Sequence, residues 1–145
     1  MQSIFKHKLL PLSLLICLLT PFTSALAEDN DVTKIVVQLT RSSENYGHRK
    51  AFFQIDKVLS EIGQKKLQIV VVAYEHGIHA LTSEASTSQL LTKLSNRGVK
   101  FKACKISMNA WKLTEDDFPL EVEFVSAGAP EMIRRQIAGY KYWKP

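Results

Sequence analysis

The chain has 145 residues, of which 46% are hydrophobic and 23% are charged, and this suits one compact domain rather than two. Its formal net charge of +5 is a mild excess of basic residues, which does not favour nucleic acid as a partner. No long low-complexity run occurs, so we do not expect a disordered chain.

The first 27 residues have the order of a secretory signal peptide. Basic residues at 6–8 precede an apolar run at 9–19, and the sequence ALA at 25–27 provides a cleavage signal. A retained anchor is the competing interpretation, but Pro11, Pro21 and several hydroxyl residues interrupt the span, whereas a transmembrane helix needs about 20 mostly apolar residues. We therefore predict a leader at 1–27, a mature domain at 28–145, a periplasmic or secreted location, and no stable membrane anchor.

Removal of the leader leaves a single cysteine. Cys17 is lost with the leader and Cys104 remains. An exported chain with one cysteine has no internal disulfide available, so its thiol pairs with another chain, stays buried and inert, or reacts.

The first half of the mature chain reads as strand, helix, strand. A run rich in β-branched residues at 34–39 predicts a strand, and an apolar run at 67–74 predicts a second strand that is buried on both faces. Between them, apolar residues recur at helical spacing from His48 to Ile62, and Gly63 stands where a helix commonly ends.

The second half continues this alternation. The predicted elements are a helix around 90–94, a strand at 99–104, a short helix at 107–113, a strand at 121–125, a helix from Pro130 to just before Gly139, and a last strand at 140–143. Lys100 and Lys102 can face Glu121 and Glu123 if the third and fourth strands are neighbours. Alternating strands and helices predict an α/β fold with a mainly parallel five-stranded sheet between helical layers.

A cysteine-containing block and a carboxyl-terminal tail resemble a known family. The sequence GVKFKACKISM at 98–108, together with VSAG at 125–128, EMIR at 131–134 and GYKYWKP at 139–145, is similar to the cysteine block and the carboxyl-terminal tail of DsrE/DsrF-like proteins. The resemblance implies a flavodoxin-like three-layer sandwich, assembly into trimers or hexamers, and a cysteine that carries sulfur as a persulfide. This chain would be an exported member.

Cys104 is the best candidate for the chemistry of this chain. It ends a predicted strand just before a helix, and in open α/β sheets ligands bind beyond the carboxyl ends of the strands. The amino end of the helix, together with Lys102 and Lys105, favours a thiolate, which can hold a sulfur atom or be oxidised. The alternative is an inert cysteine packed as a small hydrophobic residue.

The loop after the second strand carries His76 and His79, which could act as a base near Cys104 or as a metal pair. Two histidines alone supply half a metal site, so we expect no metal. With the strand order 2-1-3-4-5 that is common in flavodoxin-like folds, the ends of the second and third strands lie about 10 Å apart. The simpler interpretation is therefore a pair of ordinary loop histidines.

The same strand order would place the residues after the first strand beside Cys104. Ser42, Asn45 and Tyr46 could line a pocket there and donate hydrogen bonds to an anion, although ordinary loop polarity with capping of the next helix is the simpler interpretation. No G-x-G-x-x-G, P-loop or G-x-S-x-G motif occurs, so we expect no cofactor.

Three functions fit these features. The first is a periplasmic sulfur carrier or sulfurtransferase-like protein that uses Cys104 as persulfide acceptor, with donor and acceptor proteins as partners. The second is a non-catalytic oligomeric module that binds a small ligand or a partner. The third is a thiol redox sensor. The aromatic residues Trp111, Tyr140, Tyr142 and Trp143 are of the kind enriched at interfaces, which favours a homo-oligomer in each case.

Overall fold

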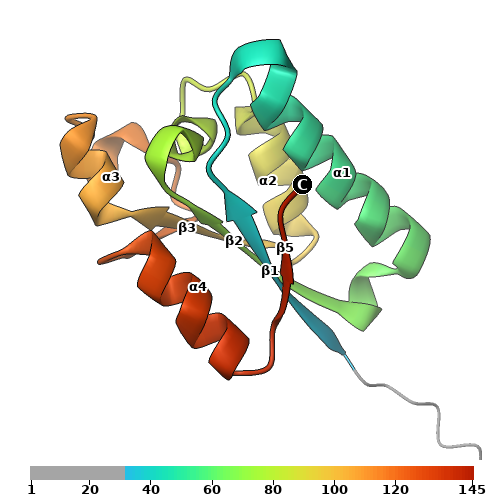
Figure 1. Cartoon of the computed structure of the whole chain (residues 1–145). Helices are drawn as coiled ribbons and strands as arrows, with labels where there is room; N and C mark the ends of the chain where they lie inside the picture. The colour runs from blue at the N-terminus through green and yellow to red at the C-terminus, as the bar shows by residue number, and fades with distance from the viewer. Residues whose placement is uncertain (1–31) are drawn as a thin grey trace, which may run out of the picture.

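A computed structural model describes residues 32–145, which form one five-stranded sheet covered by helices on both faces (Figure 1). The predicted signal peptide at 1–27 lies outside the described residues. The strands are β1 (Thr33–Leu39), β2 (Leu67–Ala73), β3 (Lys100–Cys104), β4 (Val122–Val125) and β5 (Lys141–Trp143). The α-helices are α1 (Gly47–Ile62), α2 (Ser88–Asn96), α3 (Lys105–Ala110) and α4 (Gly128–Ile137).

Every strand pairing in the sheet is parallel, which confirms the predicted α/β class. The strand order is β4-β3-β2-β1-β5, so the order 2-1-3-4-5 assumed from common flavodoxin-like folds is wrong. Strands β2, β3 and β4 each lie beside the strand that precedes them in the chain, and only the connection through α4 crosses to the far side of β1. The carboxyl ends of β2 and β3 are therefore direct neighbours, and the loop after β1 lies one strand further from β3.

The larger part of the core lies between the sheet and helices α1 and α2. Phe52 of α1 stacks on Phe101 of β3 with a centroid distance of 5.6 Å, and both side chains are fully buried. Figure 1 shows α1 and α2 on this side of the sheet and α4 on the other. The opposite core is smaller and consists of Val36, Val70, Val72, Met132 and Tyr140.

The amino end of α4 differs from the prediction. The helix begins at Gly128, so Pro130 is its third residue and not its first. Proline is tolerated there because the first turn of a helix has no partners for its backbone N–H groups. Helix α3 likewise begins directly after β3, at Lys105, two residues before the predicted start.

The predicted charge pairing between the third and fourth strands is confirmed for one pair. Lys102 lies opposite Glu123 in the register, and Lys102 Nζ is 2.7 Å from Glu123 Oε2. Glu121 lies just before β4 and accepts a hydrogen bond from Thr92.

Three-residue and longer 3₁₀ segments join several of these elements. They are η1 (Glu44–Tyr46), η2 (Gln64–Lys66), η3 (Glu75–Leu81) and η4 (Glu115–Asp117). Within residues 32–145, no helix combines the length and the apolar character that crossing a membrane requires.

Candidate functional site

Cys104 is a free, buried thiol at the end of β3, with 3% of its surface exposed. The same residue is the N-cap of α3. Its Sγ accepts a hydrogen bond from the backbone N–H of Gly128 at 3.2 Å. Gly128 opens the ten-residue helix α4, so the sulfur lies where two helices begin and where their N–H groups give a positive electrostatic potential.

Gly128 is required at this position because the ring of Tyr74 lies against it. A Cβ at residue 128 would come within 2.7 Å of Tyr74 Cγ and Cδ1. Tyr74 follows β2 directly, and its own backbone N–H donates to the carbonyl of Leu39 at the end of β1. The Tyr74 ring therefore sets how closely the start of α4 approaches the sheet, and hence where the Gly128 N–H points.

The hydroxyl of Tyr74 is fixed by a chain of hydrogen bonds that crosses β1. Gln38 Nε2 donates to Tyr74 Oη, and Tyr142 Oη of β5 donates to Gln38 Oε1. Burial raises the pKa of the Tyr74 phenol above its ordinary value, and the hydrogen bond from Gln38 partly offsets this. Tyr74 thus stays neutral over the physiological range.

The two lysines near Cys104, Lys102 and Lys105, each form ion pairs with carboxylates. Lys102 Nζ lies 2.7 Å from Glu123 Oε2 and 4.0 Å from Glu131 Oε1. Lys105 Nζ lies 2.8 Å from Glu115 Oε1. The role of the lysines as stabilisers of a thiolate stays a prediction. Because both ammonium groups pair with glutamates, their effect on the Cys104 sulfur would act through the local electrostatic field.

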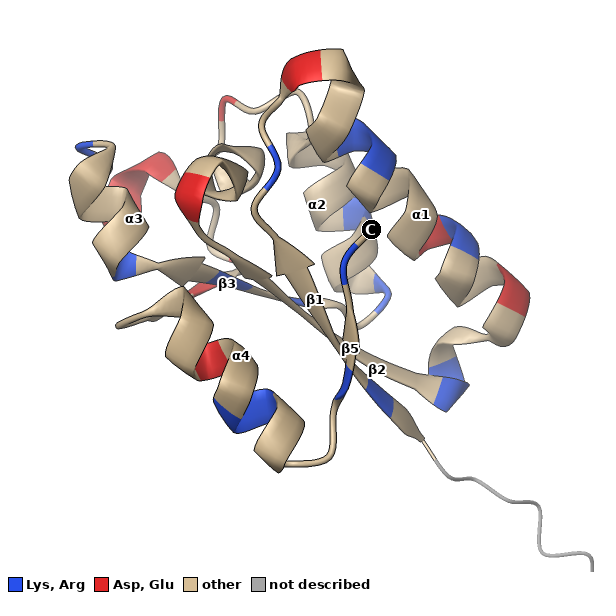
Figure 2. Ribbon diagram, in the orientation of Figure 1, with Lys and Arg blue, Asp and Glu red and all other residues tan. Residues whose placement is uncertain are grey.

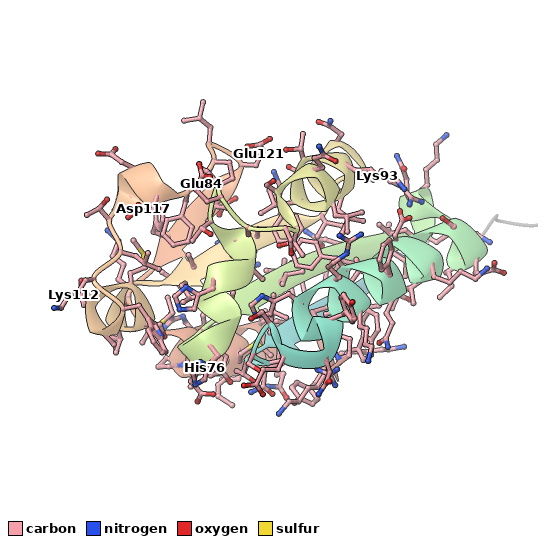
Figure 3. The ribbon with its side chains drawn as sticks, turned by 90° about the horizontal axis from the view of Figure 1, so that it is seen from above. His76, Glu84, Lys93, Lys112, Asp117 and Glu121 are labelled. Atoms are coloured by element: carbon pink, nitrogen blue, oxygen red, sulfur yellow. The ribbon has the colours of Figure 1, made fainter. Side chains whose placement is uncertain are left out.

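The loop that carries His76 and His79 lies against α3. Because β2 and β3 are neighbours, the distance argument that separated these histidines from the Cys104 region is wrong. The Glu75 backbone N–H donates to Ser107 Oγ of α3 at 2.8 Å, and Glu75 itself has a left-handed φ of 52°. Figure 3 looks along the molecule from above and shows His76 on this coil, beside α3.

A pocket of about 470 Å³ lies between η3 and α3. It is lined by Glu75, His76, Ile106, Ser107, Ala110 and Trp111. The Trp111 ring is flanked by His76, with a centroid distance of 5.0 Å, and by His79, at 4.8 Å. The pocket is at the carboxyl ends of the parallel strands, the edge where α/β folds bind ligands.

The predicted residues after β1 lie at a separate pocket. Ser42 and Asn45 line a hollow of about 400 Å³ together with Arg41, Glu44, Gly47 and Lys50, and Tyr46 is 74% exposed. This hollow shares no lining residue with the pocket between η3 and α3. The two groups of predicted site residues are therefore not brought together.

The residues that hold Cys104 in place could not be identified from sequence patterns. Gly128 stood out only as part of a motif, and Tyr74 only as the end of an apolar run. The close approach of α4 to Tyr74 depends on tertiary structure, which local patterns do not contain. Among residues 32–145, no group of three or more His, Cys, Asp or Glu side chains is arranged to hold a metal ion.

Comparison with known proteins shows a family and structures of similar fold. The sequence model of the DsrE/DsrF-like family matches residues 33–145. The solved structure of MTH1491, a protein of unknown function from Methanobacterium thermoautotrophicum, is similar in fold, with a TM-score of 0.72 and 25% sequence identity. The similarity covers 78% of this chain and 99% of that chain. The comparison with curated proteins gave no match.

Proposed function

The chain belongs to the DsrE/DsrF-like family, and on that premise we propose that it is an exported sulfur carrier in which Cys104 accepts sulfur as a persulfide. The family is linked to sulfur relay, and the predicted signal peptide favours a periplasmic or secreted location. The observation that carries the proposal is the hydrogen bond from the Gly128 N–H to Cys104 Sγ.

The proposed step is a thiolate exchange. The Cys104 thiolate attacks the outer sulfur of a donor persulfide, R–S–SH. The donor S–S bond breaks, a new S–S bond forms on Cys104, and R–S⁻ leaves. Atoms and charge balance without an oxidant, because the transferred sulfur keeps its oxidation state.

The start of α4 gives this step its electrostatic support. A thiolate and a terminal persulfide sulfur both carry negative charge, and a helix N-terminus stabilises an anion by about 0.3–1 kcal/mol at exposed sites and more where it is buried. Cys104 has 3% of its surface exposed, so little water competes for the Gly128 N–H. The burial would also protect a persulfide from oxidation.

Self-association forms part of the proposal. Helix α4 leaves Ile133 and Ile137 56% and 82% exposed, and Tyr142 of the edge strand β5 is 50% exposed. Large exposed apolar side chains on one side of a molecule favour an interface. We therefore expect a homo-oligomer, a trimer or hexamer, that covers this side.

The test is intact mass spectrometry of the protein after exposure to a persulfide donor, with and without reductant. We expect a gain of one sulfur atom that reductant removes, that maps to Cys104, and that is absent from Cys104→Ser. A Cys104→Ser protein that still folds and still gains the sulfur contradicts the proposal.

One observation favours a second function, a non-catalytic binding module. The same burial that would protect a persulfide also fits an inert cysteine. If the native protein gains no sulfur and Cys104 is alkylated only after unfolding, the fold serves binding instead. A redox sensor is identified by peroxide treatment and a non-reducing gel: Cys104 forms a sulfenic acid or a disulfide-linked dimer in a protein that gains no sulfur from the persulfide donor.

A further inference from the structure

The helix that follows Cys104 forms part of an apolar pocket whose lining side chains are partly exposed. Ile106 is 62% exposed and Trp111 is 42% exposed, and together with Ala110 they form the apolar side of the 470 Å³ pocket. Its other side is polar. Ser107, with 7% of its surface exposed, accepts a hydrogen bond at its Oγ from the Glu75 N–H, and Glu75 also lines the pocket. The pocket has the size of one or two large side chains.

A second, acidic hollow adjoins the first through His79, which lines it and packs against Trp111. Its volume is about 260 Å³, and His79, Thr82, Ser83, Glu84, Leu113, Asp116 and Asp117 line it. His79 contacts the edge of Trp111, which lines the first pocket. The two hollows are therefore joined by one aromatic cluster, apolar on one side and acidic on the other.

The charge of this region is opposite to that of the whole chain. Residues 75–84 and 105–121 carry six carboxylates and two lysines, whereas the chain as a whole has a net charge of +5. Within residues 32–145, no ion pair involves Glu75, Glu84 or Asp116. Figure 2 shows acidic segments around α3 and the coil after β2, and Figure 3 shows Glu84, Asp117 and Glu121 on the same side of the molecule.

We propose that these two hollows dock a basic segment of a partner protein, with one large apolar side chain between Ile106 and Trp111 and a Lys or Arg beside Glu84 and Asp116. The carboxylates of Glu84 and Asp116 in the acidic hollow attract a cationic side chain by Coulomb interaction. The exposed apolar walls gain most when an apolar side chain removes them from water.

The position of this surface relative to Cys104 indicates which protein would dock there. Ser107 on the pocket floor is on the first turn of the helix that follows Cys104, so a partner bound here reaches the same edge of the sheet as the sulfur. In this respect the inference rests on the proposed function, because the partner would be the protein that gives sulfur to Cys104 or takes sulfur from it. The surface itself needs no reactive cysteine to bind.

The probe is an acetylated and amidated nonapeptide with the sequence GKGSFSGKG, titrated into the ¹⁵N-labelled protein. The two tryptophans provide an internal comparison, because Trp111 lies at the surface and Trp143 lies in β5. We expect the indole N–H of Trp111 and the amides of Glu75 and Ser107 to shift, and the indole N–H of Trp143 to stay in place. Affinity falls as salt rises, since screening weakens the charge pairing.

Two peptides and three variants test the chemistry. Replacement of both lysines by glutamate, or of phenylalanine by serine, should abolish the shifts. Glu84→Gln combined with Asp116→Asn should weaken binding about threefold to fivefold, in line with exposed ion pairs. Trp111→Ala should weaken it at least about tenfold. The matched control is Glu61→Gln, an exposed carboxylate of α1 that pairs with Lys57 and should leave binding unchanged.

Several outcomes overturn the proposal. The first is equal binding of the glutamate peptide, and the second is a set of shifts that maps away from both hollows. Shifts of Trp111 that depend on protein concentration without any peptide assign the surface to a second copy of this chain. Cys104→Ser separates the two proposals, since peptide binding should persist in this variant while sulfur loading is lost. Peptide binding that fails in both proteins rejects the docking surface and leaves the sulfur carrier standing.

Discussion

The backbone N–H of Gly128 donates a hydrogen bond to Cys104 Sγ across 3.2 Å, and this contact joins the first residue of α4 to the last residue of β3. The Tyr74 ring packs on the other side of Gly128. The environment of the sulfur therefore depends on the distance between α4 and the end of β2, which a single added methyl group would change.

Gly128→Ala tests this dependence. The new Cβ would meet the Tyr74 ring at 2.7 Å, so α4 has to move away from the sheet and its N–H from the sulfur. We expect the free energy of unfolding to fall by about 1–3 kcal/mol, the usual cost of overpacking, and sulfur loading of Cys104 to slow. Urea unfolding and the rate of persulfide formation measure the two effects.

Gly98→Ala is the matched control. Gly98 has a φ of 89° and open space around its Cα, so alanine there strains the backbone without touching the sulfur. It should cost about 1 kcal/mol of stability and leave the loading rate unchanged. Equal loading rates in both variants would show that the Gly128 contact does not matter for the chemistry.

Tyr74→Phe separates the hydroxyl of Tyr74 from its ring. The ring contact with Gly128 stays, but Gln38 loses the acceptor of its amide N–H, at a cost of about 1–3 kcal/mol if the group remains unpaired. Burial raises the folded-state pKa of this phenol, so its stabilising effect is present below its ordinary value of 10.0 and is lost as pH rises beyond it.

A tyrosinate absorbance titration gives the readout for Tyr74. The Tyr74 phenol of the wild-type protein should ionise above 10.0, and the Tyr74→Phe protein should lack this ionisation. A titration curve unchanged by the substitution contradicts the burial assigned to this hydroxyl. Tyr46, which is 74% exposed, provides the control, because Tyr46→Phe should remove a phenol without affecting stability.

Local sequence patterns predicted the helices and strands of the fold, but they did not predict the order of the strands in the sheet. The apolar run of Val70, Val71 and Val72 indicates a strand buried on both faces, and the structure has all three at most 1% exposed. The same run is consistent with any central position in a parallel sheet. Which strand lies next to β3 depends on where each crossing connection leads, and no residue pattern encodes that.

The candidate site shows the same division. Cys104 could be chosen because it is the only cysteine after the predicted leader and ends a strand. Trp111 was noted as a residue of the kind enriched at interfaces, but its contacts with His76 and His79 follow only from the adjacency of β2 and β3. Strand order was therefore the missing piece of information.

Glu131→Gln tests a buried carboxylate behind the site. The side chain of Glu131 is 9% exposed and accepts hydrogen bonds from Arg134 and Arg135, with Lys102 at 4.0 Å. Burial alone would raise its pKa, but the hydrogen bonds from the two arginines outweigh this and hold the pKa below its ordinary value of 4.5. Loss of the charge should cost about 1–3 kcal/mol near neutral pH.

The sign of the pH effect follows from the lowered pKa of Glu131. The stabilisation is present above 4.5 and is lost as pH falls through the folded-state pKa, so the variant and the wild-type protein should converge in stability in acid. Urea unfolding of both proteins at neutral pH and at a pH well below 4.5 measures this convergence. Glu61→Gln removes an exposed charge, so its stability should differ little from that of the wild-type protein at either pH.

His48 should make the protein sensitive to mild acid. This residue of α1 is 6% exposed, and its Nε2 lies 2.8 Å from the carbonyl oxygen of Arg41. Burial lowers its pKa below the ordinary value of 6.5, against the raising effect of hydrogen bonds to the backbone of Arg41 and His76. The neutral ring is thus the form that the fold holds, and its contribution to stability is present above 6.5 and lost as pH falls through the folded-state pKa.

The measurement is urea unfolding at about pH 7.5 and about pH 5.5, in wild-type protein and in His48→Gln. Glutamine keeps a donor for the Arg41 carbonyl but cannot be protonated, so the variant should lose part of the stability difference between the two pH values. A ring titration of His48 by NMR should give a midpoint below 6.5. A midpoint at or above 6.5 would mean that the hydrogen bonds to Arg41 and His76 outweigh burial, and acid would then strengthen the link between α1 and the loop that carries His76.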